Sequence, residues 1–248
     1  MAGVSFNSIP LANYGVTVLR ADKDSLQYGI DAAQLQEKAY TWKGKQQPRS
    51  IELEVLIATT AVYTDIHTLL SIVRGMLNEE EPCKLSLTAL TDRYWLAHFR
   101  DMSGGLVSPG AWRGLLSFYC PDARAYDVSE VATSHTPITA SPCTVVETTG
   151  GNATIEPVYL FSGATVATSL TIENVSSAEA LVWTGALLIT DTLEVDSTTW
   201  LVKKTGTASM ATVTGKFPRL GPGANDIKVT GHGTNLGTLK ITYRNRFI

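Results

Sequence analysis

The 248-residue chain lacks the features that membrane insertion, secretion and disulfide bonding require. No stretch approaches the about 20 consecutive apolar residues of a spanning helix, and residues 1–5 offer neither a basic start nor a long apolar run. The cysteines have no paired spacing, which predicts reduced thiols at Cys83, Cys120 and Cys143. We therefore expect a soluble protein, made in a cytoplasm, with no membrane contact.

Charge is also scarce. Charged residues make up 17% of the chain and the net charge is −3. Sequence-specific nucleic-acid binding proteins usually carry a basic surface, and such a surface is absent overall. This balance argues against a nucleic-acid reader.

Motifs for metals, cofactors and nucleophilic catalysis are missing. The sequence has no GxGxxG, GxxxxGK[ST] or GxSxG pattern. The four histidines have no i, i+4 partner and no nearby CxxC: His67, His98, His135 and His232. We expect neither a metal site nor a cofactor.

One pair of carboxylates has a spacing that catalysis could use. Glu194 and Asp196 would share a face of a strand, about 7 Å apart, which lies in the range of the acid and base of inverting glycosidases. Leu193 and Val195 would then face the core, which favours a solvated pair on the wet face. The interpretation is that the protein is not an enzyme.

Residues 64–80 carry the one clear helical pattern. Thr64 or Asp65 can cap the first turn, and Pro82 ends the helix because proline has no N–H to donate. The apolar stripe comprises Ile66, Leu69, Leu70, Val73 and Leu77. The other face is neither basic enough for a membrane surface nor rich enough in base-reading side chains for DNA. We expect the helix to pack on a sheet.

The rest of the first half is typical of strands. Residues 50–57 alternate between apolar and polar side chains, which predicts a strand with one buried face. Residues 84–88 show the same alternation. Two further strands are expected at 93–99 and 114–120, joined by a Gly/Ser/Pro-rich loop around 103–105.

Residues 20–49 form a polar stretch in which basic residues flank aromatic ones. Interleaving of this kind can mark a nucleic-acid surface, but a solvated hairpin or arm is favoured here. Exposed aromatic side chains are enriched at protein interfaces. The predicted interface residues are Tyr40, Trp42, Lys43 and Lys45.

A change in composition divides the chain. Residues 128–151 are rich in Ser, Thr, Pro and Gly, which predicts a first domain at 1–140 and a second at 141–248. Short strands recur about every ten residues in the second domain, as in a sandwich or barrel. Its aromatic residues Tyr159, Trp183 and Trp200 could stack on sugar rings, although at least two of them are expected in the core. A carbohydrate-binding module that adheres to host cell-surface glycans is therefore the alternative function.

Several blocks spread over the chain form a recognisable series: Phe6-Asn7 and residues 49–57, the helix, 82–85, 92–95, 116–126, 188–196 and 217–227. Their order and spacing resemble the distal tail proteins (Dit) of long-tailed, siphovirus-type bacteriophages. The opening differs from the Asn-Gly that is usual in this family by having Asn7-Ser8.

The resemblance implies a mainly β protein of two domains. The first would be a ring-forming (belt) β domain with one α-helix, and the second a galectin-like β-sandwich. In this family a homo-hexameric ring joins the tail tube protein to the tail-tip hub (baseplate) and DNA passes through its lumen. The tape measure protein and a receptor-binding protein or host glycan are further implied partners, and the implied location is the virion tail tip.

Overall fold

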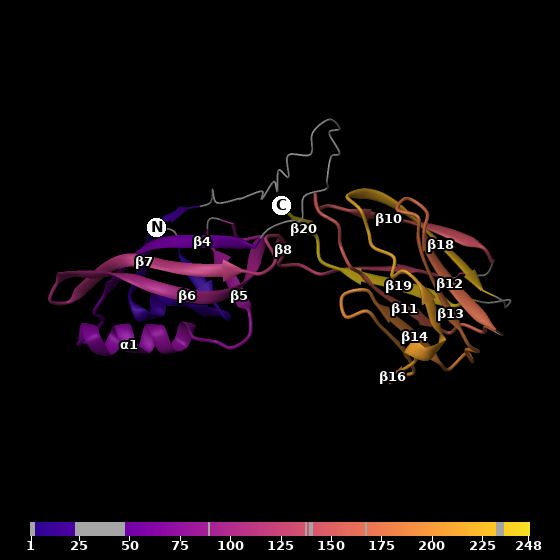
Figure 1. Ribbon diagram of the computed structural model, residues 1–248, viewed down its shortest axis with the longest axis horizontal. Coiled ribbons are helices and arrows are strands. Elements are labelled where there is room, and N and C mark those ends of the chain that lie inside the picture. Colours follow the sequence, from indigo (N-terminus) through magenta and orange to yellow (C-terminus); the bar gives the residue numbers. More distant parts are fainter. Residues whose placement is uncertain are drawn as a thin grey trace, which may run out of the picture. The chain divides into compact units, whose positions relative to one another are not determined.

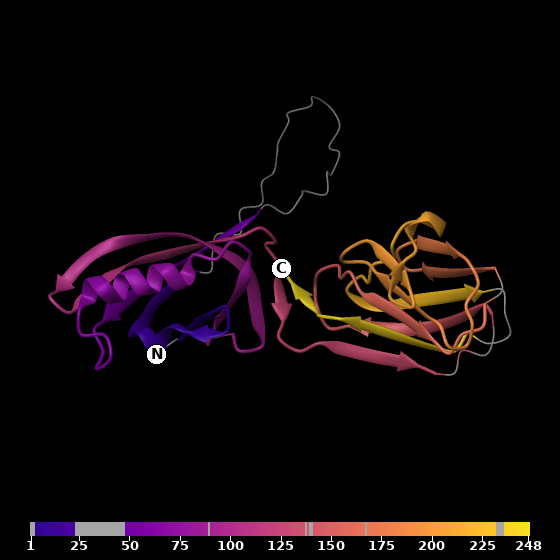
Figure 2. The same cartoon turned by 90° about the horizontal axis from the view of Figure 1, so that it is seen from below.

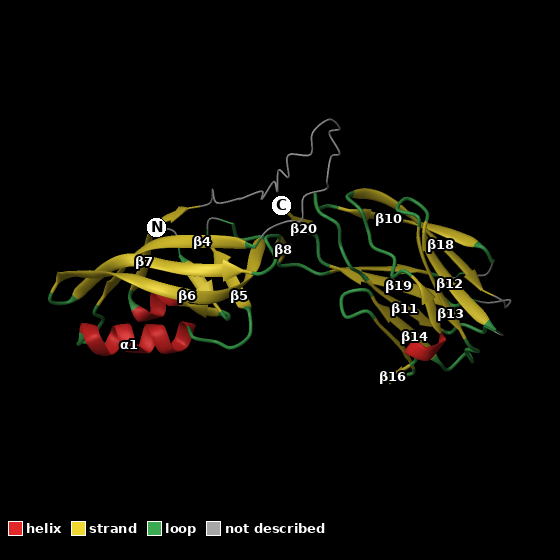
Figure 3. Cartoon of the chain, viewed as in Figure 1, coloured by secondary structure: helices red, strands yellow, loops and turns green. Residues whose placement is uncertain are grey.

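The computed structural model describes residues 3–22, 48–88, 90–136, 138, 141–166, 168–231 and 236–248. The chain divides into two compact units, Met1–Ala125 and Tyr126–Ile248. Strands dominate both units, and the described residues contain one α-helix, in the first unit (Figure 3). The mainly β fold class with a single helix is thus confirmed.

The strands of the first unit follow the order β2-β1-β5-β6-β7-β4-β3, with antiparallel neighbours (Figure 1). Their bounds are β1 Val4–Phe6, β2 Ile9–Pro10, β3 Val16–Asp22, β4 Arg49–Ala58, β5 Cys83–Leu87, β6 Arg93–Ser108 and β7 Ala111–Cys120. The 3₁₀ helix η1 (Leu11–Tyr14) follows β2, and β8 (Ala125–Asp127) begins where the unit ends.

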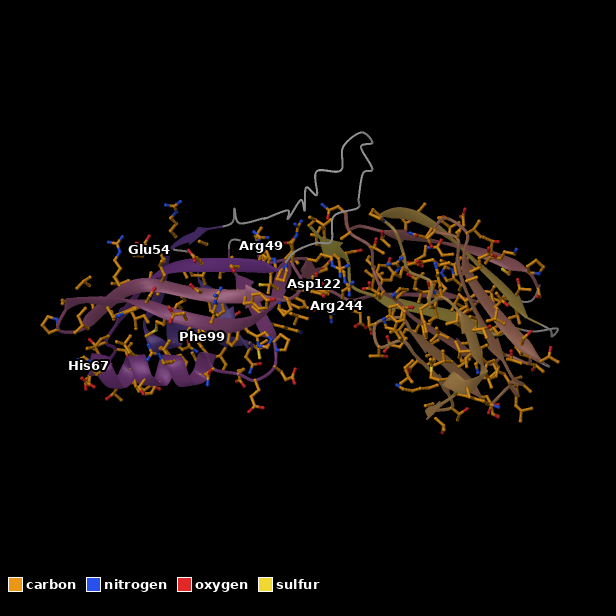
Figure 4. The ribbon with its side chains drawn as sticks, viewed as in Figure 1. Arg49, Glu54, His67, Phe99, Asp122 and Arg244 are labelled. Atoms are coloured by element: carbon orange, nitrogen blue, oxygen red, sulfur yellow. The ribbon has the colours of Figure 1, made fainter. Side chains whose placement is uncertain are left out.

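Strand β4 lies inside this sheet, between β3 and β7. Ile51, Leu53, Val55 and Ile57 are buried, as their alternation with polar residues predicted. The opposite face carries Glu54, which Figure 4 shows on the side of β4 away from the helix. The face of the sheet that carries these four side chains is therefore the apolar one.

Helix α1 (Ile66–Leu77) covers the apolar face (Figures 1 and 2). It is shorter than the expected 64–80, because Asp65 forms the N-cap by accepting a 2.7 Å hydrogen bond from the Thr68 N–H and Asn78 forms the C-cap. The hydrogen bonds from Thr68 hold the pKa of Asp65 below its usual value. Among the five predicted stripe residues, Leu70 is only half-buried, so the expectation that it is buried is wrong.

Strands β6 and β7 form a hairpin through the segment expected to be a loop. Residues 103–105 belong to β6, and the chain turns instead at Pro109 and Gly110. Gly104 and Gly114 are register partners in this hairpin. A Cβ on Gly114 would lie 2.2 Å from the carbonyl oxygen of Ser103 and 2.4 Å from the Trp112 ring. Glycine is therefore required here because the two strands approach closely beneath the Trp112 ring, and these glycines do not form a loop.

The second unit consists of two antiparallel sheets (Figure 1). The five-stranded sheet has the order β10-β18-β12-β13-β17 and the six-stranded sheet the order β16-β15-β14-β11-β19-β9. The bounds are β9 Val131–His135, β10 Cys143–Thr149, β11 Val158–Ser162, β12 Ser169–Asn174, β13 Glu179–Thr184, β14 Thr192–Asp196, β15 Leu201–Lys204, β16 Thr207–Ala208, β17 Val213–Gly215, β18 Gly223–Gly231 and β19 Thr238–Tyr243. The 3₁₀ helix η2 (Met210–Thr212) precedes β17, and β20 (Arg246–Phe247) pairs with β8.

Apolar side chains from both sheets form one core, which makes this unit a β-sandwich. It begins earlier than the composition suggested, because β9 lies in residues 128–151 and pairs with β19 along its whole length. The Ser/Thr-rich composition of β9 suits a half-exposed edge strand. The unit boundary therefore lies after Ala125, whereas the sequence placed the division after residue 140. A galectin-like relationship remains a prediction.

Candidate functional site

The far part of the β6–β7 hairpin is highly exposed among the described strands of the first unit. Strand β6 pairs with β5 only as far as Ala97, so residues 103–108 extend past β5 and pair with β7 on one side (Figure 1). All six of these residues are exposed. Leu106 lies opposite the buried Trp112 and is still 51% exposed. The apolar face of the sheet thus continues, uncovered, to the edge of β6.

A second open edge belongs to β3. This strand ends the sheet order, and β4 is its one ladder partner among the described residues. The register shifts between Val18 and Arg20, and the intervening Leu19 is 47% exposed. Within the described residues, each of these edges thus has an exposed leucine and no ladder partner on its outer side. Sheet edges of this kind are templates for pairing with another chain.

The face of the sheet away from α1 is mixed in character. Arg113 on β7 donates a 2.9 Å hydrogen bond from Nε to Glu54 on β4. Leu115 and Tyr119 of β7 lie on the same face and are partly exposed. This ion pair offsets one positive and one negative charge on that face.

The predicted interface residues Tyr40, Trp42, Lys43 and Lys45 lie outside the described residues. They remain predictions.

The structure separates the three aromatic residues that were candidates for stacking on sugars. Tyr159 and Trp183 are core residues with almost no exposed surface. The Tyr159 hydroxyl donates to the carbonyl of Pro218, and the indole Nε1–H of Trp183 donates to Ser209. Burial raises the pKa of Tyr159 well above its usual value. Neither ring has a face open to a ligand, whereas Trp200 is 66% exposed.

Trp200 is held in an unusual conformation on the turn between β14 and β15. Its φ angle is +59°, in the left-handed region that a bulky residue rarely adopts. Its ring lies 5.8 Å from that of Phe217, with an interplanar angle of 50°. Sequence reasoning missed Phe217, because it lies in a turn-rich stretch of Pro and Gly with no periodicity.

Glu194 and Asp196 lie on β14 as expected, with partners that occupy both carboxylates. Glu194 accepts a 2.9 Å hydrogen bond from Nζ of Lys203. Burial alone would raise the pKa of Asp196, but hydrogen bonds from the hydroxyls and backbone N–H groups of Thr198 and Thr199 outweigh burial and lower it. Asp196 thus organises the turn before Trp200, and its lowered pKa does not suit a general acid near neutral pH.

Other candidate chemistry is equally unsupported in the part of the chain that the structure describes. No three His, Cys, Asp or Glu side chains there lie together in a way that could hold a metal ion. Burial raises the pKa of the Cys120 thiol to about 12, so that this sulfur stays protonated and inert near neutral pH. None of the described helices is long and apolar enough to cross a membrane.

Comparisons with known proteins agree with these observations. Residues 150–247 match the family model described as the siphovirus-type tail component, C-terminal domain. No curated protein matches the chain significantly. The crystal structure of the Dit (gp 19.1) protein of phage SPP1, described as a paradigm of the hub adsorption apparatus in phages that infect Gram-positive hosts, matches with a TM-score of 0.79. It is 16% identical, and the match covers 100% of each chain.

A weaker likeness is to the phage P2 baseplate in its activated conformation with Ca, at a TM-score of 0.49 and 9% identity over 99% of this chain and 98% of that one. The SPP1 likeness shows the fold, and the family model adds a sequence match over the second unit. Together they confirm the resemblance to the distal tail proteins.

Proposed function

We propose that this chain, whose C-terminal domain belongs to the siphovirus-type tail component family, is a structural protein of a phage tail tip. Six copies would form a ring that joins the tail tube to the tail-tip hub of the baseplate. DNA would pass through the lumen of the ring without base-specific contact. The first unit would build the ring and the second would lie outside it.

The two open edges of the first unit carry this proposal. Strands β6, β7, β4 and β3 are neighbours in that order and alternate in direction. Placing β3 of one copy beside β6 of the next copy therefore continues the antiparallel alternation. Such a contact joins two different surfaces, so repeating it gives a ring when the rotation closes. The ring size of six comes from the family resemblance.

The exposed leucines strengthen the assignment of these edges. Leu106 on β6 and Leu19 on β3 are about half exposed in the single chain. Adding a strand at each edge would bury them and satisfy the open backbone groups.

The proposed partners follow from a position between the tube and the hub. They are the tail tube protein, the hub protein and the tape measure protein, with a receptor-binding protein on the outer domain. The protein would act in the virion, after synthesis in the bacterial host cytoplasm. Its role is mechanical, and we propose no enzymatic activity.

Native mass spectrometry and electron microscopy of the concentrated full-length protein test the ring. We expect six-fold rings with a mass of six 26.7 kDa chains. Replacing Leu106 with Lys places a charge on the β6 edge and should shift the protein to monomers, because edge lysines oppose strand addition. Val62→Lys is the matched control, since Val62 is equally apolar, is exposed and lies on neither edge. A wild-type protein that stays monomeric when concentrated, or an L106K variant that assembles normally, contradicts the proposal.

A further inference from the structure

We infer that Trp200, backed by Phe217, is a saccharide-binding platform of the second unit, in which the sugar ring stacks on the exposed indole. This inference is independent of the ring, because every residue involved belongs to the second unit.

The backbone at Trp200 shows that the exposed indole is held in place. A non-glycine residue in the left-handed region is strained and persists where its surroundings fix it. Here Asp196 fixes the turn by accepting hydrogen bonds from the backbone N–H groups of Thr198 and Thr199 and from both hydroxyls. Glycine would occupy the position of Trp200 without strain. The chain instead places there the aromatic side chain that is most exposed among the described residues.

Phe217 supports the indole from the protein side. It is half-buried and packs against the core of the sandwich. The indole contacts the Phe217 ring while two thirds of Trp200 stays accessible to solvent. Backing by a core-packed ring limits the motion of the indole, so a ligand that stacks on it loses little additional side-chain entropy.

Several residues near this platform in the sequence are polar. Thr198 and Thr199 precede Trp200, and the exposed Lys216 and Arg219 lie one residue before and two residues after Phe217. Arg219 binds Glu179, and its side chain is still about half exposed. An exposed aromatic ring with polar residues near it in the sequence matches a pyranose ring, which has an apolar C–H face and a rim of hydroxyls. Binding sites for such ligands combine aromatic contact with a few placed polar groups.

Other stacking ligands fit less well. Nucleobases stack on aromatic rings, but their backbone requires positive charge. Residues 126–248 contain eight basic and ten acidic residues, a net charge of −2. A membrane surface or protein hot spot requires a wider apolar patch, whereas the neighbours of Trp200 along the turn are threonines.

Isothermal titration of the full-length protein with maltohexaose, chitohexaose and a galactose oligosaccharide tests the platform. We expect at least one of them to bind with a dissociation constant of about 0.1–1 mM, typical of a shallow site that uses few contacts. Trp200→Ala should weaken that binding by about tenfold or more, because stacking supplies most of the contact. Trp200→Phe should retain part of the affinity.

Ile189→Ala is the matched control. Ile189 is 64% exposed in the same unit, on the turn before β14, and its loss should leave saccharide binding unchanged. Unchanged thermal unfolding of all three variants would show that the sandwich is intact. The inference is overturned if no saccharide binds at about 10 mM, or if the W200A variant binds as tightly as the wild type.

Discussion

At the scale of single residues, the φ angles identify a strained position that the sequence alone does not indicate. Strands β1 and β2 are joined by Asn7 and Ser8, both with positive φ angles of 50° and 64°. This two-residue connection has the geometry of a type I′ turn, in which the second position favours Gly. Asn adopts the left-handed region readily, whereas Ser has no such preference. Ser8 therefore holds strain that a glycine would relieve.

Ser8→Gly should raise the free energy of unfolding by about 0.5–1 kcal/mol, because the strain relieved exceeds the added entropy of the unfolded chain. Urea denaturation of the full-length protein, followed by circular dichroism, measures the change. The control is Asn7→Gly, which should bring no gain because it also removes the 3.2 Å hydrogen bond from Asn7 to Glu79. A less stable S8G variant would count against a type I′ turn here.

The residue scale also limits what sequence can say about the candidate site. Tyr159, Trp183 and Trp200 are all aromatic residues in or beside strands, so no local pattern distinguishes them. Two lie in the core and one lies on a turn. The difference depends on which strand face meets the opposite sheet and on the angle of one turn residue. Both are set by tertiary packing, which single-sequence periodicity does not contain.

At the scale of elements, the sequence predicted the existence and position of the helix, but only part of its buried face. The spacing of apolar residues located the helix. Its buried residues in the structure are Ile66, Leu69, Val73 and Leu77. Leu70 lies beside this stripe because one residue turns the helix by about 100°. Leu69 and Leu70 thus form a matched pair of identical, adjacent residues with different burial.

Leu69→Ala should lower the stability of the first unit by about 2–5 kcal/mol, because it leaves a cavity beneath the helix. Leu70→Ala should cost less than about 1 kcal/mol, since that side chain is already partly exposed to water. Thermal unfolding followed at 222 nm compares the two. Equal losses would mean that the sheet covers a different face of α1.

Strands were predictable where alternation was strict and unpredictable where glycines served packing. The buried residues of β4 agree one by one with the pattern. The β6–β7 hairpin does not, because Gly104 and Gly105 signal a loop in the sequence while Gly104 fits against Gly114 in the structure. The open edge of β6, on which the ring proposal depends, could therefore not be predicted from the sequence.

At the scale of the whole molecule, the structure differs from the sequence-based prediction in where the second unit begins. Glu147 on β10 is buried and accepts hydrogen bonds from Thr133, at 3.0 Å, and from the hydroxyl of Tyr243, at 2.9 Å. His135 lies 3.2 Å from its other oxygen. Thr133 and His135 belong to β9, so this strand helps to satisfy a buried carboxylate of the opposite sheet. Residues Val131–His135 therefore contribute to the fold of the sandwich and do not act only as a linker.

Two fragments distinguish the boundaries. We expect residues 126–248 to fold alone, with a cooperative urea transition, because they contain both sheets and their core. Residues 141–248 should be less stable by at least about 2 kcal/mol, since losing β9 leaves Glu147 buried with fewer partners and uncovers the edge of β19. Thr133→Val in the longer fragment removes a single bond to Glu147 and should cost less than the truncation. If 141–248 unfolds at the same urea concentration as 126–248, then β9 adds no stability and the boundary after residue 140 is the better one.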